Sequence, residues 1–141
     1  MKKSRLGALA MTGAATVAMM GLATAPAQAG TAGYNLCAQA TSSVYNSLCL
    51  YYNSNQEGSF AAFTRNVADL EPWIFGHIGT PNSAGQGQGV KNNAASAANP
   101  GDNCWRVYFN SNYAGASDYI GDSGYRQLIH TYNENASVKA C

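Results

Sequence analysis

The stretch that decides the fold is Leu50-Tyr51-Tyr52-Asn53-Ser54-Asn55-Gln56-Glu57-Gly58, which returns 57 positions later as Val107-Tyr108-Phe109-Asn110-Ser111-Asn112-Tyr113-Ala114-Gly115. An internal repeat of this kind predicts a chain built from two copies of one small unit. In each copy aromatic residues come first, an Asn-Ser-Asn turn follows, and a glycine closes the segment. Because aromatic residues favour strands and Asn and Gly favour turns, each copy is expected to contain a twisted β-hairpin.

A second repeated element ends each copy. Lys91-Asn92-Asn93-Ala94-Ala95-Ser96-Ala97 matches Tyr132-Asn133-Glu134-Asn135-Ala136-Ser137-Val138 at an offset of 41. The shorter offset means that the first copy carries a 16-residue insertion, which we place within residues 66–90. This part includes Trp73-Ile74-Phe75 and the glycine-rich residues 80–89, and a long loop inside a small domain is commonly functional or disordered.

The N-terminus has the features of a secretory signal peptide. Lys2, Lys3 and Arg5 precede an apolar stretch over residues 6–22, and Ala27-Gln28-Ala29 is a small-residue cleavage site. A transmembrane anchor is the alternative, but the apolar stretch is short, rich in glycine and followed by Pro26. We therefore expect residues 1–29 to be removed, and a secreted, extracellular chain that begins at Gly30.

The charge and composition of residues 30–141 exclude some functions and favour strands. Five basic and seven acidic residues remain there, a net charge of −2 without a basic patch, so nucleic acid is not an expected partner. Few charges and many Tyr, Asn, Ser and Gly residues favour short strands and polar turns. In the second copy, Trp105, Val107 and Phe109 are expected on one strand face. Short helical turns are expected at 38–45 and 125–131.

The four cysteines predict two disulfides, because an even number in a small exported domain is typical of such bridges. Four cysteines allow three pairings. Cys37 and Cys49 bracket the entry to the first copy, and Cys104 and Cys141 bracket the second, which favours Cys37–Cys49 and Cys104–Cys141. A zinc site is disfavoured, because no pair has the short spacing of zinc ligands and the two histidines are isolated.

The repeat has the pattern of a βγ-crystallin Greek-key motif: Tyr108-x₄-Tyr113-x-Gly115, followed by Asn133-x₃-Ser137. The glycine can adopt positive φ where the hairpin folds over its sheet, the tyrosines would pack around that bend, and the serine hydroxyl would bind backbone groups that the bend leaves unpaired. The first copy has the corresponding Tyr51, Gly58 and Ser96, but Gln56 stands where the second aromatic belongs.

The fold class expected from this resemblance is all-β: a disulfide-stabilised, βγ-crystallin-like sandwich of two Greek-key motifs in one domain over 30–141. Motif one would cover about 34–99, with the insertion at about 66–90, and motif two about 102–141.

Two such motifs, a bacterial signal peptide and a cysteine just before the first Leu-Tyr-Tyr hairpin resemble the family of secreted actinobacterial proteinase inhibitors of the Streptomyces metalloproteinase inhibitor type. The resemblance implies a monomeric inhibitor of extracellular metalloproteases of the thermolysin class, with a protease as partner and no membrane. No motif identifies the inhibitory loop, for which residues 80–89 and 117–125 are candidates. The alternative is a calcium-binding or structural βγ-crystallin-like domain, or a killer-toxin-like secreted protein.

The resemblance also suggests a weak calcium site. Calcium sites of βγ-crystallins use an Asn/Asp-Asn/Asp-x-x-Ser/Thr-Ser signature, which Asn92, Asn93 and Ser96 match in part and Asn133, Glu134 and Ser137 match less well. The first stretch has no carboxylate, which hard cations prefer. The interpretation that both serines stabilise folded hairpins is favoured, and no cofactor is expected.

No catalytic motif is present, so an enzyme is not expected. His77 and His130 are isolated, and neither a zinc-protease motif nor a nucleophile elbow occurs. The cysteines are assigned to disulfides. Asn135-Ala136-Ser137 is formally a glycosylation sequence, interpreted here as coincidence at a structural serine.

Overall fold

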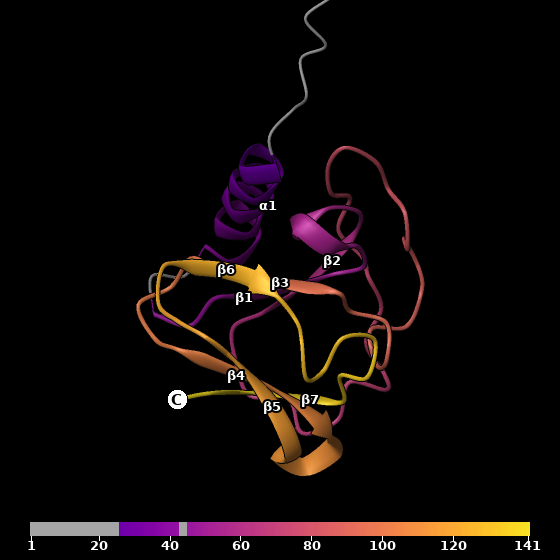
Figure 1. The fold of residues 1–141 in the computed structure, drawn as a ribbon, viewed down its shortest axis with the longest axis vertical. Coiled ribbons are helices and arrows are strands. Elements are labelled where there is room, and N and C mark those ends of the chain that lie inside the picture. Colours follow the sequence, from indigo (N-terminus) through magenta and orange to yellow (C-terminus); the bar gives the residue numbers. More distant parts are fainter. Residues whose placement is uncertain (1–25, 43–44) are drawn as a thin grey trace, which may run out of the picture.

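Two antiparallel sheets and one helix make up the chain in the computed structural model, which describes residues 26–42 and 45–141 (Figure 1). Most of the predicted signal peptide, residues 1–25, lies outside the described residues. The elements are α1 (Pro26–Thr41), β1 (Leu48–Tyr51), η1 (Ser54–Gln56), β2 (Phe60–Phe63), β3 (Ser96–Asn99), β4 (Trp105–Asn110), η2 (Ser111–Tyr113), β5 (Ala114–Ile120), β6 (Gly124–Gln127) and β7 (Ser137–Ala140).

Each repeat forms a Greek key that places one segment in the other repeat's sheet. The first sheet has the order β2-β1-β3-β6 and the second β5-β4-β7. β6 of the second repeat pairs with β3 of the first, with Ala97 opposite Arg126. In return, Val67 of the first repeat forms two backbone hydrogen bonds of 2.9 and 3.0 Å with Val138 of β7. The expected βγ-crystallin-like sandwich is confirmed, and the exchange joins the two repeats into one structure.

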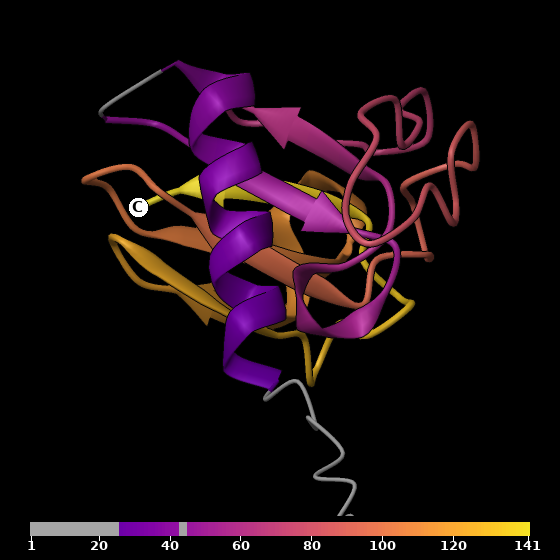
Figure 2. The ribbon, with the colours of Figure 1, turned by 90° about the horizontal axis from the view of Figure 1, so that it is seen from above.

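Strand β1 of the first sheet is buried on both faces, and its alternation shows how. Leu48 and Leu50 point into the main core between the sheets. Cys49 and Tyr51 point the other way, into a smaller cluster beneath α1. Figure 2 shows α1 lying across this outer face of the sheet. A strand buried on both sides needs an uninterrupted apolar run, which Leu-Cys-Leu-Tyr provides.

The second sheet follows the predicted alternation only in part. Trp105 and Val107 are fully buried, but Phe109 is 39% exposed. On the predicted common face of the three residues, Phe109 is the exposed one, and it lies where the register of β4 against β5 shifts between Tyr108 and Asn110. A bulge of this kind ends the two-residue alternation.

One of the two predicted helical turns is confirmed in part, and the other is wrong. Of the turn expected at 38–45, residues 38–41 are helical as the end of α1, a 16-residue helix that begins at Pro26, before the predicted cleavage site, and residues 43–44 lie outside the described residues. Residues 125–131 contain most of β6 followed by a turn, because pairing with β3 outweighs local preference. Among the described residues, no helix is long and apolar enough to cross a membrane.

Candidate functional site

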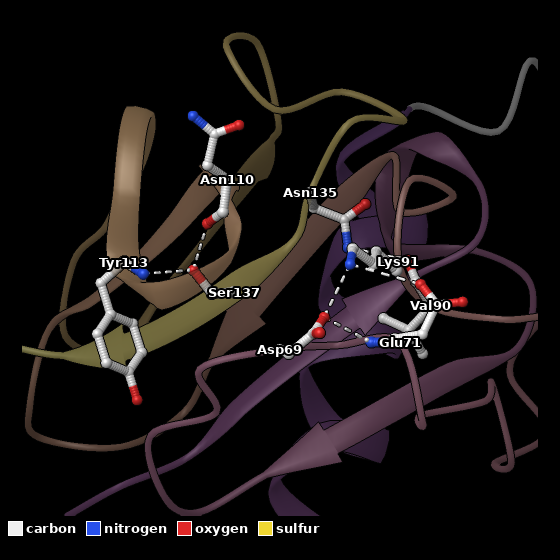
Figure 3. A network of polar contacts seen from close by, with 8 residues as sticks. All are labelled: Asp69, Glu71, Val90, Lys91, Asn110, Tyr113, Asn135 and Ser137. Carbon is white, nitrogen blue, oxygen red and sulfur yellow. Dashed lines mark hydrogen bonds and ion pairs between the residues drawn. The ribbon is translucent and has the colours of Figure 1, made fainter.

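The two serines of the repeat occupy equivalent positions beneath the two folded turns. Ser137 Oγ donates to the Asn110 carbonyl at 2.7 Å and accepts from the Tyr113 N–H at 3.0 Å (Figure 3). Ser96 Oγ forms the same pair, donating to Asn53 O at 2.6 Å and accepting from Gln56 N at 2.9 Å. Both serines are fully buried. Each hydroxyl therefore satisfies one carbonyl and one N–H of its turn.

The turns themselves require backbone with positive φ. Gly58 and Gly115 have φ of 75° and 80°, a region open to glycine, and both turns also contain non-glycine residues with positive φ. In the second turn, the rings of Tyr108 and Tyr113 meet edge to face with centroids 6.1 Å apart. The aromatic pair thus packs at the bend.

The first turn is built differently because α1 covers it. Gln56, at the position equivalent to Tyr113, is 2% exposed, and its amide donates to the carbonyls of Ala97 at 3.3 Å and Arg126 at 3.0 Å. A Cβ at Gly33 of α1 would lie 2.4 Å from Gln56 O, so the helix backbone touches the turn directly. An aromatic ring at position 56 has no room beneath this helix, and glutamine satisfies two buried carbonyls instead.

Two disulfides lie at the ends of the fold, in the pairs that the repeat favours. Cys37 of α1 is bonded to Cys49 of β1, and Cys104 to Cys141, across separations of 12 and 37 residues. The first attaches α1 to the sheet and the second joins the chain end to the start of β4. Each bridge closes a loop and so reduces the conformational entropy of the unfolded chain. Both bridges therefore stabilise the native chain.

The structure brings three of the six candidate calcium residues to one surface hollow and uses both serines within the folded turns. Ser96 and Ser137 are bonded within the turns, and the Asn93 amide donates to Gly89 O at 2.9 Å. Asn92, Asn133 and Glu134 line one surface hollow of about 510 Å³. A second hollow, of about 420 Å³, contains Asn93 and Asn133.

Charged side chains line both hollows beside the neutral amides. Glu134 is the carboxylate of the first hollow and Glu57 that of the second. Lys91 also lines the first hollow, and its ammonium would repel a dication. Its Nζ lies 2.9 Å from Asp69 and 3.4 Å from Glu71 (Figure 3). In the described part of the chain, no group of three or more acidic, histidine or cysteine side chains could hold a metal.

Asn135 joins the two serine-bearing loops at the centre of the molecule. Its side chain donates to Val90 O at 2.9 Å and accepts from Ala94 N at 2.9 Å. Its carbonyl accepts from Asn92 N, while Asn133 N donates to Ala94 O, both at 2.8 Å. Asn135 is fully buried. A structural role therefore accounts for the Asn-Ala-Ser sequence.

Asp118 is the buried carboxylate of the second repeat. Its Oδ2 accepts from the N–H of Ile129 at 3.0 Å, and from the N–H and hydroxyl of Thr131 at 2.9 and 2.8 Å. Burial by itself would raise the pKa of Asp118, but these hydrogen bonds outweigh it, and the pKa lies below its ordinary value of 3.8. The carboxylate holds the turn after β6.

The histidines are separate, and the two loops suggested for inhibition have different structures. His77 stacks on Phe60, with centroids 4.9 Å apart, and His130 lies on the surface in another part of the chain. The prediction of a loop over 117–125 is wrong, because β5 continues to Ile120 and β6 begins at Gly124. Residues 80–89 do form a loop, but hydrogen bonds from Gln86 to Ser83 and from Gln88 to Gly85 fold it into turns.

The inserted part of the first repeat packs on the edge of β2 and on the core. Phe75 is fully buried and meets the Tyr52 ring at a centroid distance of 5.6 Å. Val90 is fully buried too, and its N–H donates to Trp73 O at 2.9 Å. Figure 2 shows this connection beside β2, at one end of the sheets. The insertion is thus an ordered part of the fold.

The comparison with family models gives the identity of this scaffold: the model of peptidase inhibitor family I36 matches residues 30–120, well over half of the chain. The chain belongs to peptidase inhibitor family I36. This is the family of the Streptomyces metalloproteinase inhibitor type, and the resemblance predicted from the motifs is confirmed. Membership in I36 implies a peptidase as partner and a protein that is not an enzyme.

Solved structures place this I36 chain among βγ-crystallin folds. It is similar to a structure from work on the evolution of the eye-lens βγ-crystallin domain fold, with a TM-score of 0.52 and 14% identity, over 70% of this chain and 87% of that one. A βγ-crystallin from Ciona intestinalis gives a TM-score of 0.51 and 16% identity, over 68% of this chain and 100% of that one. At such identities the similarity concerns the fold alone. The comparison with curated protein sequences gave no match.

Proposed function

We propose that this I36 chain is secreted and inhibits extracellular metalloproteases of the thermolysin class. The observation that carries the proposal is the family match over residues 30–120. The signal-peptide pattern and the two disulfides support an extracellular location, because disulfides persist in oxidising compartments. Cleavage after Ala29 would leave Gly30, a buried residue of α1, at the new N-terminus.

The scaffold has the rigidity that an inhibitor of peptidases needs. A peptide segment that is already held in its bound shape loses little conformational freedom when it enters a cleft. Two packed sheets, an external helix and two disulfides provide such support. The same support keeps a segment in place if the enzyme attacks it, so that product release is slow.

Inhibition is tested with residues 30–141, refolded with both disulfides formed, against a purified thermolysin-class protease. Hydrolysis of a short fluorogenic peptide is followed at increasing protein concentration. We expect the rate to fall with an inhibition constant of micromolar or lower. A serine protease assayed in parallel is the control for specificity and should retain full activity.

Other outcomes of this assay would contradict or change the proposal. Unchanged hydrolysis by several secreted zinc proteases at micromolar protein would contradict it, and inhibition of the serine protease alone would move the target to another class. Mass measurement of the chain exported by a bacterial host, with Gly30 expected at its N-terminus, tests the secretion step separately.

A further inference from the structure

The inserted part of the first repeat contains a short extended stretch on the outside of β2, formed by Gly76, His77, Ile78 and Gly79 and called the edge segment below. His77 and Phe60 exchange both backbone hydrogen bonds, at 3.0 and 2.9 Å, and their rings stack. The edge segment is therefore an added strand position beside β2, although it is outside the regular sheet.

Side chains alternate along this stretch and leave two isoleucines facing solvent. Phe75 is buried and His77 stacks on Phe60, so the residues between and beside them face outward. Ile74 is 56% exposed and Ile78 is 63% exposed. Between them, a Cβ at Gly76 would meet nothing within 4 Å. The result is an open apolar stripe with a notch at its centre.

The backbone on the same stretch has an open edge. In a strand, the N–H and C=O of successive residues point to opposite sides. Because both groups of His77 face β2, those of Gly76 and Ile78 face away from it. Neither residue has a backbone hydrogen bond to another described residue. This edge can accept one further extended strand.

Both ends of the edge segment are fixed. A Cβ at Gly79 would lie 1.6 Å from Gly58 O, so the two backbones are in direct contact. The Thr80 carbonyl accepts a hydrogen bond of 3.1 Å from Gly58 N. On the other side, the N–H and C=O of Phe75 bond to Gln88 and Gly87, at 2.9 and 3.0 Å. Ile78 is thus an exposed side chain between two buried anchors.

We propose that the edge segment is the part of this inhibitor that enters the metalloprotease cleft. It would pair with the enzyme as an antiparallel strand, with Ile78 in an apolar side-chain pocket. Peptide recognition by strand addition takes affinity from main-chain hydrogen bonds and specificity from pockets for alternate side chains, and the edge segment offers both. This inference rests on the proposed function, because it identifies the contact surface for that partner.

The segment also differs from the other candidates in shape. Residues 80–89 are folded into turns, and several of their backbone groups are hydrogen-bonded within the loop or to neighbouring segments of the chain. In the second repeat, the chain between β5 and β6 has only residues 121–123. Extended backbone, free hydrogen-bonding groups and an exposed aliphatic side chain occur together in the edge segment.

The test compares Ile78→Asp with a matched control, Ile129→Asp. Ile129 is equally exposed, at 65%, but lies in the turn after β6 of the second repeat. Each protein is titrated against the thermolysin-class protease that the wild-type chain inhibits. We expect Ile78→Asp to weaken inhibition by roughly 30-fold or more, the loss typical of a hot-spot residue. Ile129→Asp should remain within about twofold, and Ile78→Leu should retain most of the inhibition.

The outcomes separate the contact surface from the function. If the wild-type chain and Ile78→Asp inhibit equally, the edge segment is not the contact surface and the proposed function stands. Equal weakening by Ile129→Asp would also overturn the assignment. If the wild-type chain inhibits no metalloprotease, both proposals fail. Equal thermal unfolding of the three variants and the wild type verifies that the changes act on binding.

Discussion

At the scale of single residues, the two repeats show the same backbone problem solved with different side chains. Ser96 and Ser137 make matching pairs of hydrogen bonds, because each folded turn leaves one carbonyl and one N–H without a partner. The residues at the bend differ: Tyr113 packs on an aromatic neighbour, whereas Gln56 lies beneath α1. Gln56 is therefore suited to a turn that a helix covers. The two repeats have the same residue type, serine, where the backbone of the turn requires it.

Asp118 is the residue for which a pH effect is expected. Its pKa is lower in the folded chain than in the unfolded one, so the unfolded chain binds the proton more readily. Its contribution to stability is complete above the ordinary pKa of 3.8 and is lost as the pH falls through the lower, folded value. At neutral pH, Asp118→Asn should reduce the free energy of unfolding by about 1–3 kcal/mol.

Urea unfolding of the wild type and Asp118→Asn at pH 7 and at steps below pH 4 measures this effect. The difference between the two proteins should shrink as the pH falls. Asp102→Asn, at an exposed aspartate, is the control and should unfold like the wild type. A difference that is absent at pH 7, or constant down to the lowest pH, would exclude this role for Asp118.

At the scale of elements, α1 and the insertion distinguish this chain from a plain pair of Greek keys. α1 covers the outer face of the first sheet and is attached by the Cys37–Cys49 bridge. Tyr51 adds a second attachment: its hydroxyl donates to Gly33 O at 2.7 Å, and burial raises the pKa of this phenol. The insertion lies at the β2 edge of the same sheet, so both additions belong to the first repeat.

Tyr51→Phe tests the contact between α1 and the sheet. Removing the hydroxyl leaves the Gly33 carbonyl without its donor, and we expect a loss of about 1 kcal/mol in the free energy of unfolding. Relative to the wild type, amide hydrogen exchange should become faster in α1 and stay unchanged in β4 and β7. The effect should remain local because the disulfide still holds α1 to the sheet. Tyr45→Phe, at a tyrosine that is 67% exposed, should change neither quantity. Uniformly faster exchange would argue against a local role.

At the scale of the whole molecule, the exchange of segments between the sheets makes the two repeats depend on each other. β6 completes the first sheet, and Val67 lies beside β7 in the second. Neither repeat can form its full set of strand contacts without the other. The protein is therefore expected to unfold in one cooperative step, as small single domains do.

The two disulfides should contribute unequally to that step. In the chain-entropy model, the stabilisation grows with the length of the closed loop, and the separations here are 12 and 37 residues. Replacing both cysteines of a pair by serine should cost about 3 kcal/mol for Cys37–Cys49 and about 4 kcal/mol for Cys104–Cys141. Midpoints in guanidinium chloride measure both losses, and the reverse order would show that native contacts of α1 outweigh loop length.

Sequence alone was sufficient for the βγ-crystallin-like sandwich and for the family resemblance, because a repeat of aromatic residues, turn residues, glycine and serine specifies a local backbone shape wherever it occurs. It also favoured the two cysteine pairs found in the structure. The errors arose where distant contacts outweigh local preference. Residues 125–127 form a strand only because β3 lies beside them. Phe109, on its predicted face, is exposed where a bulge shifts β4.

The position of α1 against Gln56 and the extended shape of the edge segment depended on tertiary structure in the same way. Ile78 looks like an ordinary apolar residue in the sequence. Its exposure follows from anchors at Phe75 and Gly79, whose partners lie elsewhere in the chain. Local chemistry determines turns and strands, whereas the residues left open on the surface depend on what packs around them.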